Sequence, residues 1–523
     1  MDSTKEKKDY GSDIDDEERR LGTPISPTTE ADTFAPIQSE LPVDEESKDP
    51  IQGDFTVKWE ENDPQNPRNK LSYARKWAIT VIIAGSSMCV TNASSLYTST
   101  YGQIIPEFHS SREVVTLGLS TFVFGLGLGP MVLSPLSEFY GRRPVYIASY
   151  SFFLIWLIPC AVARNTATML VARFFDGLAG SAFLSVAGGT IGDMFSRDQL
   201  SAPMMVYSAS PFMGPEIGPL VGGFINQYTN WRWSFYILLI WAGVQLALIT
   251  FFVPETYHPV LLRRKAQELR KSTGNEAWIA PLEKHERSIP MTVFISCYRP
   301  FQLLFFEPMC LNLCILSAIL LGILYLFFGA FPLVFKENHD FTLSQTGLSF
   351  LGLMVGMIIA ILSDPWWKRN HRRLCRNLEA RTGEHGASEP EYRLPPAILG
   401  AFLVPIGLFG KSWTPISAGC WHCTPIIFSG VFGVGIILVF SGVFTFLVDC
   451  YPLYAASALA ANSFARSSFA AAFPLFGVQM YETLGYPWAS SLLAFLSLAM
   501  APFPYLFFKY GKRLRGKSRF ASS

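Results

Sequence analysis

Charged residues are scarce in this sequence. They make up 16% of the 523 residues, whereas half of the residues are hydrophobic and 14% are aromatic. A soluble domain carries roughly 25% charged residues, so this composition argues against a soluble enzyme. A nucleotide-binding loop of the form Gly-x-x-x-x-Gly-Lys-Ser/Thr is also missing, as are a catalytic triad and a metal-binding helix motif. We therefore expect no enzyme and no ATP-driven pump.

The cysteines of the sequence do not have the spacing of a disulfide framework. The nine cysteines are scattered along the chain, and the only close pair with a histidine is Cys420-Trp421-His422-Cys423. A metal site needs more ligands than this segment offers. We interpret the segment as a local disulfide or two free thiols, and we expect neither a metal nor a cofactor.

Long apolar runs are the main feature that the sequence does contain. About 20 largely apolar residues are needed to cross about 30 Å of hydrocarbon, and runs of this kind recur along the chain. The expected spans are residues 77–98, 114–135, 145–163, 168–191, 202–225, 233–253, 306–331, 345–363, 395–411, 424–448, 454–479 and 486–508. The fold class is therefore an all-α membrane protein with twelve transmembrane helices in two six-helix halves.

The polar segments predict the domain organisation. The expected parts are a disordered cytosolic tail (1–76), a six-helix half (77–253), a cytosolic central loop (254–300), a second six-helix half (301–508) and a short basic cytosolic tail (509–523). The first 58 residues are acidic and rich in Pro, Ser and Thr, a composition that cannot bury enough apolar surface to fold. No apolar run follows a basic start, so we expect no signal peptide.

Basic residues predict the orientation of the spans. They are frequent in the loops that we assign to the cytosol, and the other side has about one per loop. The basic residues assigned to that other side are Arg112, Arg164, Arg232, Lys336 and Lys411. Both termini are then cytosolic. We expect the plasma membrane rather than the vacuolar membrane, a lipid bilayer as surroundings, a monomer, and no nucleic-acid partner.

A short internal repeat supports the division into two halves. The segment Leu136-Ser137-Glu138-Phe139-Tyr140-Gly141-Arg142-Arg143 follows the second span. After the eighth span stands Leu362-Ser363-Asp364-Pro365-Trp366-Trp367-Lys368-Arg369. The carboxylate, the aromatic residue and the basic pair keep their spacing. Repeated halves with a substrate site between them are one standard construction of secondary transporters.

Three motifs resemble those of a known family. Residues 129–145 (GPMVLSPLSEFYGRRPV) resemble the loop signature between spans two and three of the major facilitator superfamily. Residues 173–180 (RFFDGLAG) are similar to its fourth-span signature, and residues 214–223 (GPEIGPLVGG) resemble its fifth-span antiporter motif. Pro254-Glu255-Thr256 and residues 462–476 are similar to the fungal twelve-span drug–proton antiporters of that superfamily. The resemblance implies the major facilitator fold.

The loop motif has a physical interpretation of its own. Gly141 permits a tight turn, and Glu138 stands four residues before Arg142, the spacing of a helical ion pair. The resemblance implies a latch that breaks during the transport cycle, with Arg143 beside it. The alternative is a loop that is basic only because it is cytosolic. The repeated spacing favours the latch, with Asp364 and Lys368 as its counterpart in the second half.

The fifth span carries a glycine stripe. Gly214, Gly218 and Gly222 recur every four residues, and Pro215, Pro219 and Gly223 run beside them. Small residues at this spacing let another helix approach closely, and prolines remove backbone hydrogen bonds and bend the helix. The resemblance adds that this motif marks exporters working by antiport.

Ionisable residues inside the spans are candidates for proton coupling, because an intramembrane charge is costly. Arg173 and Asp176 lie three apart and either pair with each other or, as the resemblance implies, take part in proton transfer. Glu216 has no basic neighbour on its own helix, and Arg466 is either its counter-charge or a cavity group. Burial disfavours the charged form of a carboxyl, so Glu216 is a candidate for proton coupling, and packing beside the kink is the alternative. Asp193, Glu307 and Asp449 stand at span ends, where we expect solvation by the interface.

The function expected from these features is proton-coupled export by alternating access. The expected partners are protons and a small lipophilic or cationic compound, either a drug, a fungicide or a self-made toxic metabolite. A polyamine exporter is one alternative. An uptake symporter or facilitator would use the same fold, but the antiporter motif and a first span without a carboxylate argue against it. A non-transporting sensor would need a longer cytosolic extension than the terminal 15 or so residues.

Overall fold

The structure is a computed structural model that describes residues 55–60, 63–196, 199–284, 288–383, 388–413, 423–516 and 518–521. The described chain is almost entirely helical, with one isolated β-bridge between Thr56 and Ile279. The acidic tail up to residue 54 lies outside the described residues, and so do Cys420, Trp421 and His422 of the cysteine pair.

Every expected span corresponds to a helix or to a run of consecutive helices. The first set is α2–η2–α3 (Tyr73–Leu96, Tyr97–Thr100, Tyr101–Phe108), α4 (Arg112–Tyr140), α5 (Arg142–Val162), α6–α7–α8 (Thr166–Gly180, Ala182–Ser185, Ala187–Met194), α9 (Ser201–Tyr228) and α10 (Arg232–Phe252). The second set is α13 (Pro308–His339), α14–α15 (Leu343–Ser349, Leu351–Leu362), α17 (Pro395–Trp413), α18 (Cys423–Cys450), α19 (Ala455–Leu484) and α20–α21 (Tyr486–Met500, Pro502–Arg515).

Nine of these twelve units, within the described chain, are long and apolar enough to cross a membrane by length and composition. The other three are α9, α17 and α19. The apolar part of α17 is short, Pro395–Gly410. Glycine, proline and polar residues lower the hydropathy of α9, and alanine, serine and Arg466 lower that of α19. These two helices pack between other helices, where they need little lipid-facing surface: α9 against α2 and α14, and α19 against α13 and α4.

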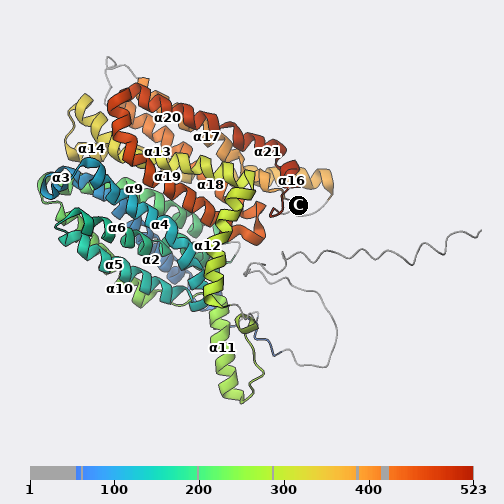
Figure 1. The fold of residues 1–523 in the computed structure, drawn as a ribbon. Helices are drawn as coiled ribbons and strands as arrows, with labels where there is room; N and C mark the ends of the chain where they lie inside the picture. The colour runs from blue at the N-terminus through green and yellow to red at the C-terminus, as the bar shows by residue number, and fades with distance from the viewer. Residues whose placement is uncertain are drawn as a thin grey trace, which may run out of the picture. The chain divides into compact units, whose positions relative to one another are not determined.

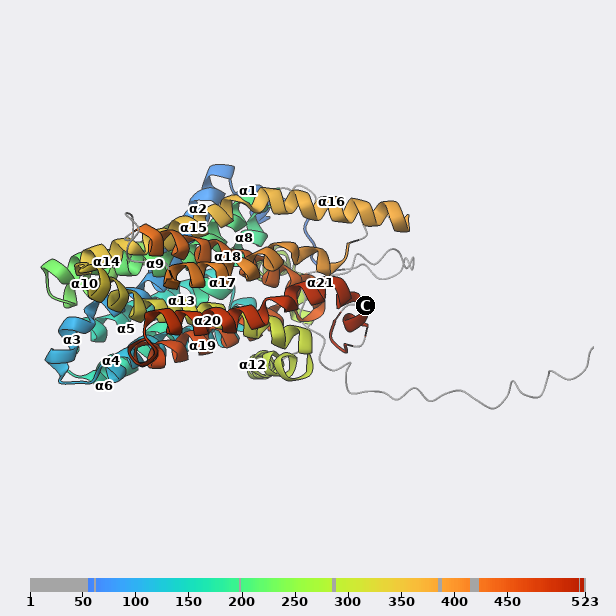
Figure 2. The same cartoon turned by 90° about the horizontal axis from the view of Figure 1, so that it is seen from above.

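The ends of the helices carry different connections. In Figure 2, α3 and α14 lie at one end, and α16 (Asp364–Thr382) and α21 lie at the other. We call the end with the Gly141 turn, α11 (His258–Thr273) and α16 the basic end, and the end with Ser110 and Thr342 the opposite end. Figure 1 shows α11 extending beyond the helices at the basic end.

Direct contacts join the first six spans to the second six at the opposite end. The backbone N–H of Ser344 donates to Gln227 Oε1 at 2.8 Å, and Gln479 Nε2 donates to Glu113 Oε1 at 2.9 Å. A Cβ on Gly347 would lie 2.4 Å from the Pro219 carbonyl oxygen, so α9 and α14 touch backbone to backbone. Closer to the middle, the hydroxyls of Ser94 and Tyr325 are 3.1 Å apart.

The last part of the expected tail is ordered. The Val57 backbone N–H donates to the Ile279 carbonyl at 3.1 Å, and Lys265 forms an ion pair with Asp63. Val57 is buried with Leu262, Ala266 and Ala280 of the central segment, and Trp59 and Trp278 pack against them. The tail prediction is therefore wrong from residue 55 on, because these apolar residues find a surface on α11. The central segment also forms α12 (Ile289–Phe306), which packs against α4 and α19.

Candidate transport site

A glycine turn separates the second span from the third. Gly141 ends α4 and precedes α5 with φ 98° and ψ 166°, a backbone conformation that is strained for residues with a side chain. A Cβ at this position would lie 2.3 Å from Glu255 Oε2. Glycine is therefore required here both for the conformation and for the approach of a carboxylate.

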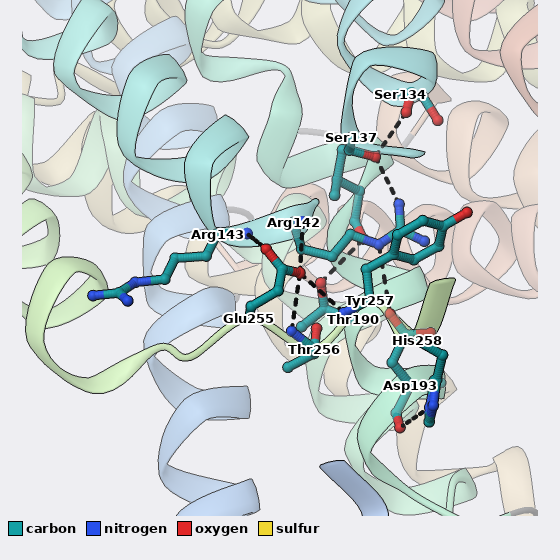
Figure 3. A network of polar contacts seen from close by, with 12 residues as sticks. Ser134, Ser137, Arg142, Arg143, Thr190, Asp193, Glu255, Thr256, Tyr257 and His258 are labelled. Carbon is teal, nitrogen blue, oxygen red and sulfur yellow. Dashed lines mark hydrogen bonds and ion pairs between the residues drawn. The ribbon is translucent and has the colours of Figure 1, made fainter. Parts of the chain in front are cut away.

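The carboxylate of Glu255 holds this turn in place (Figure 3). Its Oε1 accepts the backbone N–H of Arg142 at 2.9 Å, and its Oε2 accepts that of Arg143 at 3.2 Å. The same Oε1 also accepts the N–H groups of Thr256 and Tyr257 in its own segment. The segment after the sixth span is thereby tied to the start of the third span, where unsatisfied helix N–H groups favour an anion.

The side chain of Arg142 turns toward the fourth span. Its Nε lies 3.5 Å from Asp193 Oδ2, its Nη1 donates to Ser137 Oγ at 2.6 Å, and its guanidinium lies 4.6 Å from the centre of the Tyr257 ring. Among the described residues no ion pair at contact distance joins Arg142 to Glu138, although the two charges still interact electrostatically. The i,i+4 rule holds within one helix, and the Gly141 turn places the two residues on different helices.

A histidine completes this network. The Nε2 atom of His258 lies 3.0 Å from the Asp193 carbonyl oxygen, as Figure 3 shows. Burial lowers the pKa of His258, and the Asp193 carbonyl opposes that shift only in part. The imidazole links α11 to the end of α8.

In the second half, the corresponding residues form different ion pairs. Asp364 and Lys368 form an ion pair within α16, and their side chains are 29% and 42% exposed. The pair that corresponds in position to Arg142 and Asp193 is Arg393 with Asp449, at 2.7 Å between Nε and Oδ2. Arg393 precedes the ninth span and Asp449 stands at the end of the tenth.

The glycine stripe of α9 lies against the first span. A Cβ on Gly214 would come within 2.0 Å of Thr91 Oγ1, and one on Gly218 within 1.9 Å of Ser95 Oγ. Gly222 faces Ser99 in the same way, and Gly223 approaches the Leu343 carbonyl oxygen of the second half at 2.8 Å. Helix α9 is continuous across Pro215 and Pro219. The stripe brings α9 into close contact with α2, and Gly223 brings it against α14.

Arg173 is fully buried and well supplied with partners. Its guanidinium donates to the carbonyl oxygens of Ala93, Ser94 and Gly118 at 2.9, 3.4 and 3.3 Å. It also lies over the Phe122 ring at 4.2 Å from the centroid. Asp176 Oδ2 is 3.8 Å from Arg173 Nη1, and neither carboxylate oxygen accepts a hydrogen bond within the described chain. The two residues thus lie together, with the arginine anchored to the first and second spans.

Glu216 is the least satisfied carboxyl in the middle of the helices. Its side chain is 2% exposed, and neither oxygen has a hydrogen-bond partner in the described structure. Tyr325 of α13 interacts electrostatically with Glu216, with Arg173 and with Arg466. This tyrosine therefore stands where the charges of both helix sets meet. The sequence carries no signal that singles out Tyr325, which is one of 20 tyrosines.

Arg466 lies on the other side of this region. Its guanidinium is 4.8 Å from the Phe444 ring centre and 5.3 Å from that of Phe440, and its Nε has no hydrogen-bond partner among the described residues. No ion pair within the described chain joins it to Glu216. Of the two expected roles, the counter-charge role is therefore not realised, because aromatic faces occupy the space beside the guanidinium.

Three carboxylates that we expected to be solvated have protein partners instead. Asp193 faces Arg142, and Asp449 pairs with Arg393. Glu307 is buried and accepts from Tyr451 at 3.2 Å and from Ser518 at 2.7 Å. A carboxylate at the end of a span followed by an aromatic residue two positions on, as in Asp193–Phe195 and Asp449–Tyr451, is a signal that could have identified two of them.

Comparison with known proteins places the chain in a family. The profile of the Major Facilitator Superfamily matches residues 83–474. An efflux pump of Aspergillus terreus (atB) is 57% identical over 90% of this chain and 90% of its own length. A probable drug/proton antiporter of Saccharomyces cerevisiae (YHK8) is 43% identical over 88% of each chain.

A solved structure agrees on the fold. The xylose transporter XylE of E. coli, in a partially occluded inward-open conformation, superposes with a TM-score of 0.58 at 15% identity. The alignment covers 84% of this chain and 99% of XylE. The family profile covers most of the chain and the efflux pump of Aspergillus terreus is 57% identical to it, so the chain belongs to the major facilitator superfamily.

Proposed function

We propose that this protein is a proton-coupled exporter of small lipophilic compounds that works by alternating access. The basic end faces the cytosol of the cell and the opposite end faces outward across the plasma membrane. The two six-helix halves rock about a central site near Glu216 and Tyr325. A proton that enters from outside loads Glu216, and its release to the cytosol resets the carrier.

The burial of the Glu216 carboxyl is the main support for this proposal. A carboxyl that is 2% exposed and lacks any hydrogen-bond partner in the described chain is costly to ionise. It lies on α9, which packs against α2 in its own half and α14 in the other. Rocking of the halves would change the solvation of this carboxyl, and a change in solvation changes its affinity for protons.

The relatives and the energetics agree with antiport. One relative is named an efflux pump and another a probable drug/proton antiporter. At 100 mV one inward proton supplies about 2.3 kcal/mol, and each pH unit adds about 1.36 kcal/mol. Tenfold uphill export of a neutral compound needs about 1.4 kcal/mol, so one proton per cycle suffices.

The test is drug accumulation in a pump-deficient yeast, measured with labelled lipophilic drugs and polyamines. Cells expressing the wild-type chain, the Glu216→Gln variant or no transporter are compared with and without a protonophore. We expect the wild type to lower accumulation and the protonophore to abolish this difference. We expect Glu216→Gln to abolish it as well, because an amide cannot release a proton.

A matched control is Glu482→Gln, which removes a carboxyl from an exposed position on α19. We expect it to export normally at the same protein abundance in the membrane. Raised accumulation in wild-type cells would instead show an uptake carrier, and activity only toward polyamines would show a polyamine exporter. Full activity of Glu216→Gln would remove this carboxyl from the mechanism.

A further inference from the structure

We infer that a pocket at the opposite end binds the carboxylate of an aromatic organic acid. The pocket has a volume of about 470 Å³, within the range of sites for small organic molecules. It is lined from both helix sets: η2, α3, α4 and α9 on one side, α13 and α14 on the other. Two of its lining residues, Arg112 and Lys336, are cationic, and no carboxylate is among the described residues that line it.

Among the described residues, no carboxylate lies at ion-pair distance from either cation. Neither Arg112 nor Lys336 forms an ion pair with another described residue, although carboxylates do pair with other basic residues nearby. Arg232 at the same end is the contrast: its Nη2 lies 2.7 Å from Glu107 Oε1, and its guanidinium stacks on Trp231 at 4.4 Å. The charge of Arg112 acts on the neighbouring exposed Glu113, but Glu113 does not line the pocket. Two positive charges without an ion pair in the described chain, in one concave site, favour an anionic ligand.

These two cations are a large share of the few basic residues at the opposite end. Basic residues are rare at the opposite end, about one per loop, and two of the five sit on this one pocket. They come from different halves, because Arg112 begins α4 and Lys336 lies near the end of α13. A surface that is basic merely for solubility has no reason to bring its few cations together across the boundary between the halves.

The remaining lining defines the rest of the ligand. Phe328, Pro332, Leu333 and Phe350 provide an apolar wall suited to a flat ring. Asn226 also lines the pocket and is 7% exposed; its Nδ2 donates to the Gly222 carbonyl and to Ser234 Oγ, whereas its Oδ1 has no partner in the described chain.

This inference rests on the proposed function and sharpens its substrate class. The pocket lies between the halves beside the contacts that close the opposite end, Ser344 with Gln227 and Gly347 with Pro219. A substrate leaving outward passes this point. The expected lipophilic substrate is then an aromatic acid rather than a cation, and Arg112 and Lys336 hold its carboxylate on the release path.

The experiment compares three probes with one ring system and different charge: biphenylcarboxylate, biphenylcarboxamide and biphenylmethylamine. Their binding to the purified full-length protein is measured by equilibrium dialysis and by the melting temperature. We expect the acid to bind at least about tenfold more tightly than the amide, as charge-assisted hydrogen bonds do, and the amine to bind most weakly.

Variants assign the effect to the two cations. Arg112→Gln combined with Lys336→Gln should lose the preference for the acid while keeping the unliganded melting temperature, and Arg112→Lys should retain most of it. Arg164→Gln is the matched control, because Arg164 is an exposed basic residue at the same end that does not line the pocket. It should bind the acid as the wild type does.

The outcomes separate this inference from the proposed function. Equal binding of acid and amide, tightest binding of the amine, or unchanged acid binding in the double variant would overturn the anion site. Protonophore-sensitive export of a neutral compound would still stand in each of these cases. Conversely, acid binding that depends on Arg112 and Lys336 would support the site even where no proton-driven export is measured.

Discussion

The two copies of the internal repeat, residues 136–143 and 362–369, have different backbone conformations. In the first half the chain turns sharply at Gly141, and Arg142 leaves α4 to face Asp193. In the second half the residue at the position of Gly141 is Trp367, and the chain continues as α16. Trp367 Nε1 donates to Ser363 Oγ at 3.1 Å, one helical turn before it. Glycine at this position of the first copy permits the turn, and the Glu255 carboxylate holds it.

The ion pairs differ in the same way. The first copy has a partly buried pair between two spans, with Arg142 11% and Asp193 17% exposed. The second copy has an exposed pair within one helix, Asp364 with Lys368. A similar spacing in sequence thus gives a contact between elements in one half and a surface contact in the other. We infer that the first copy restrains the movement of spans and the second does not.

The largest difference is expected from removing one carboxylate of each pair. Asp193→Asn should lower the free energy of unfolding by about 3 kcal/mol, since it leaves Arg142 partly buried without its counter-charge. Asp364→Asn should lower it by about 0.3–0.5 kcal/mol, the value of an exposed i,i+4 pair. The measurement is thermal unfolding in detergent together with the transport rate. Equal effects of the two substitutions would contradict the distinction between the copies.

The turn itself is tested by Gly141→Ala. A side chain at φ 98° costs about 1–2 kcal/mol, and its Cβ would displace Glu255, so we expect transport to fall at least about tenfold. Gly383→Ala is the control: Gly383 has φ 74° at the end of α16, but nothing lies within 4 Å of an added Cβ. Transport by that variant should remain within about twofold of wild type. A similar loss in both would mean that backbone strain alone, and not the Glu255 contact, matters.

The spans could be predicted because hydrophobic length is a local property of the sequence. The lower hydropathy of α9 and α19 did not hide them, since the apolar runs 202–225 and 454–479 are among the expected spans. The ordered segment around Val57 and Trp59 could not be predicted from composition, because its partners on α11 lie about 200 residues away. The residues before this segment are largely acidic, so the average composition of the tail does not reveal these few apolar positions.

The pairs among the candidate residues follow from sequence spacing only within one helix, as for Arg173 with Asp176 and Asp364 with Lys368. Arg173, Glu216 and Gly141 follow from the cost of burying charge and from the need for positive φ. The partners are tertiary: Arg142 meets Asp193 rather than Glu138, and Arg466 meets two phenylalanines rather than Glu216. Spacing along one helix says which residues share a face, but it does not say which helix packs against that face.

The smallest effect on stability and transport is expected from a substitution that gives the second copy of the repeat the glycine of the first. This substitution is Trp367→Gly, and we expect the chain to remain helical there, because Trp367 lies within α16 and a single glycine weakens a helix only slightly. The cost should be about 1 kcal/mol or less, the penalty of glycine inside a helix, and transport should stay within about twofold of wild type. Helix content by circular dichroism and the transport rate measure this. A large loss of transport would show that straight continuation of α15 into α16 is needed for the cycle, and the second copy would then be as important as the first.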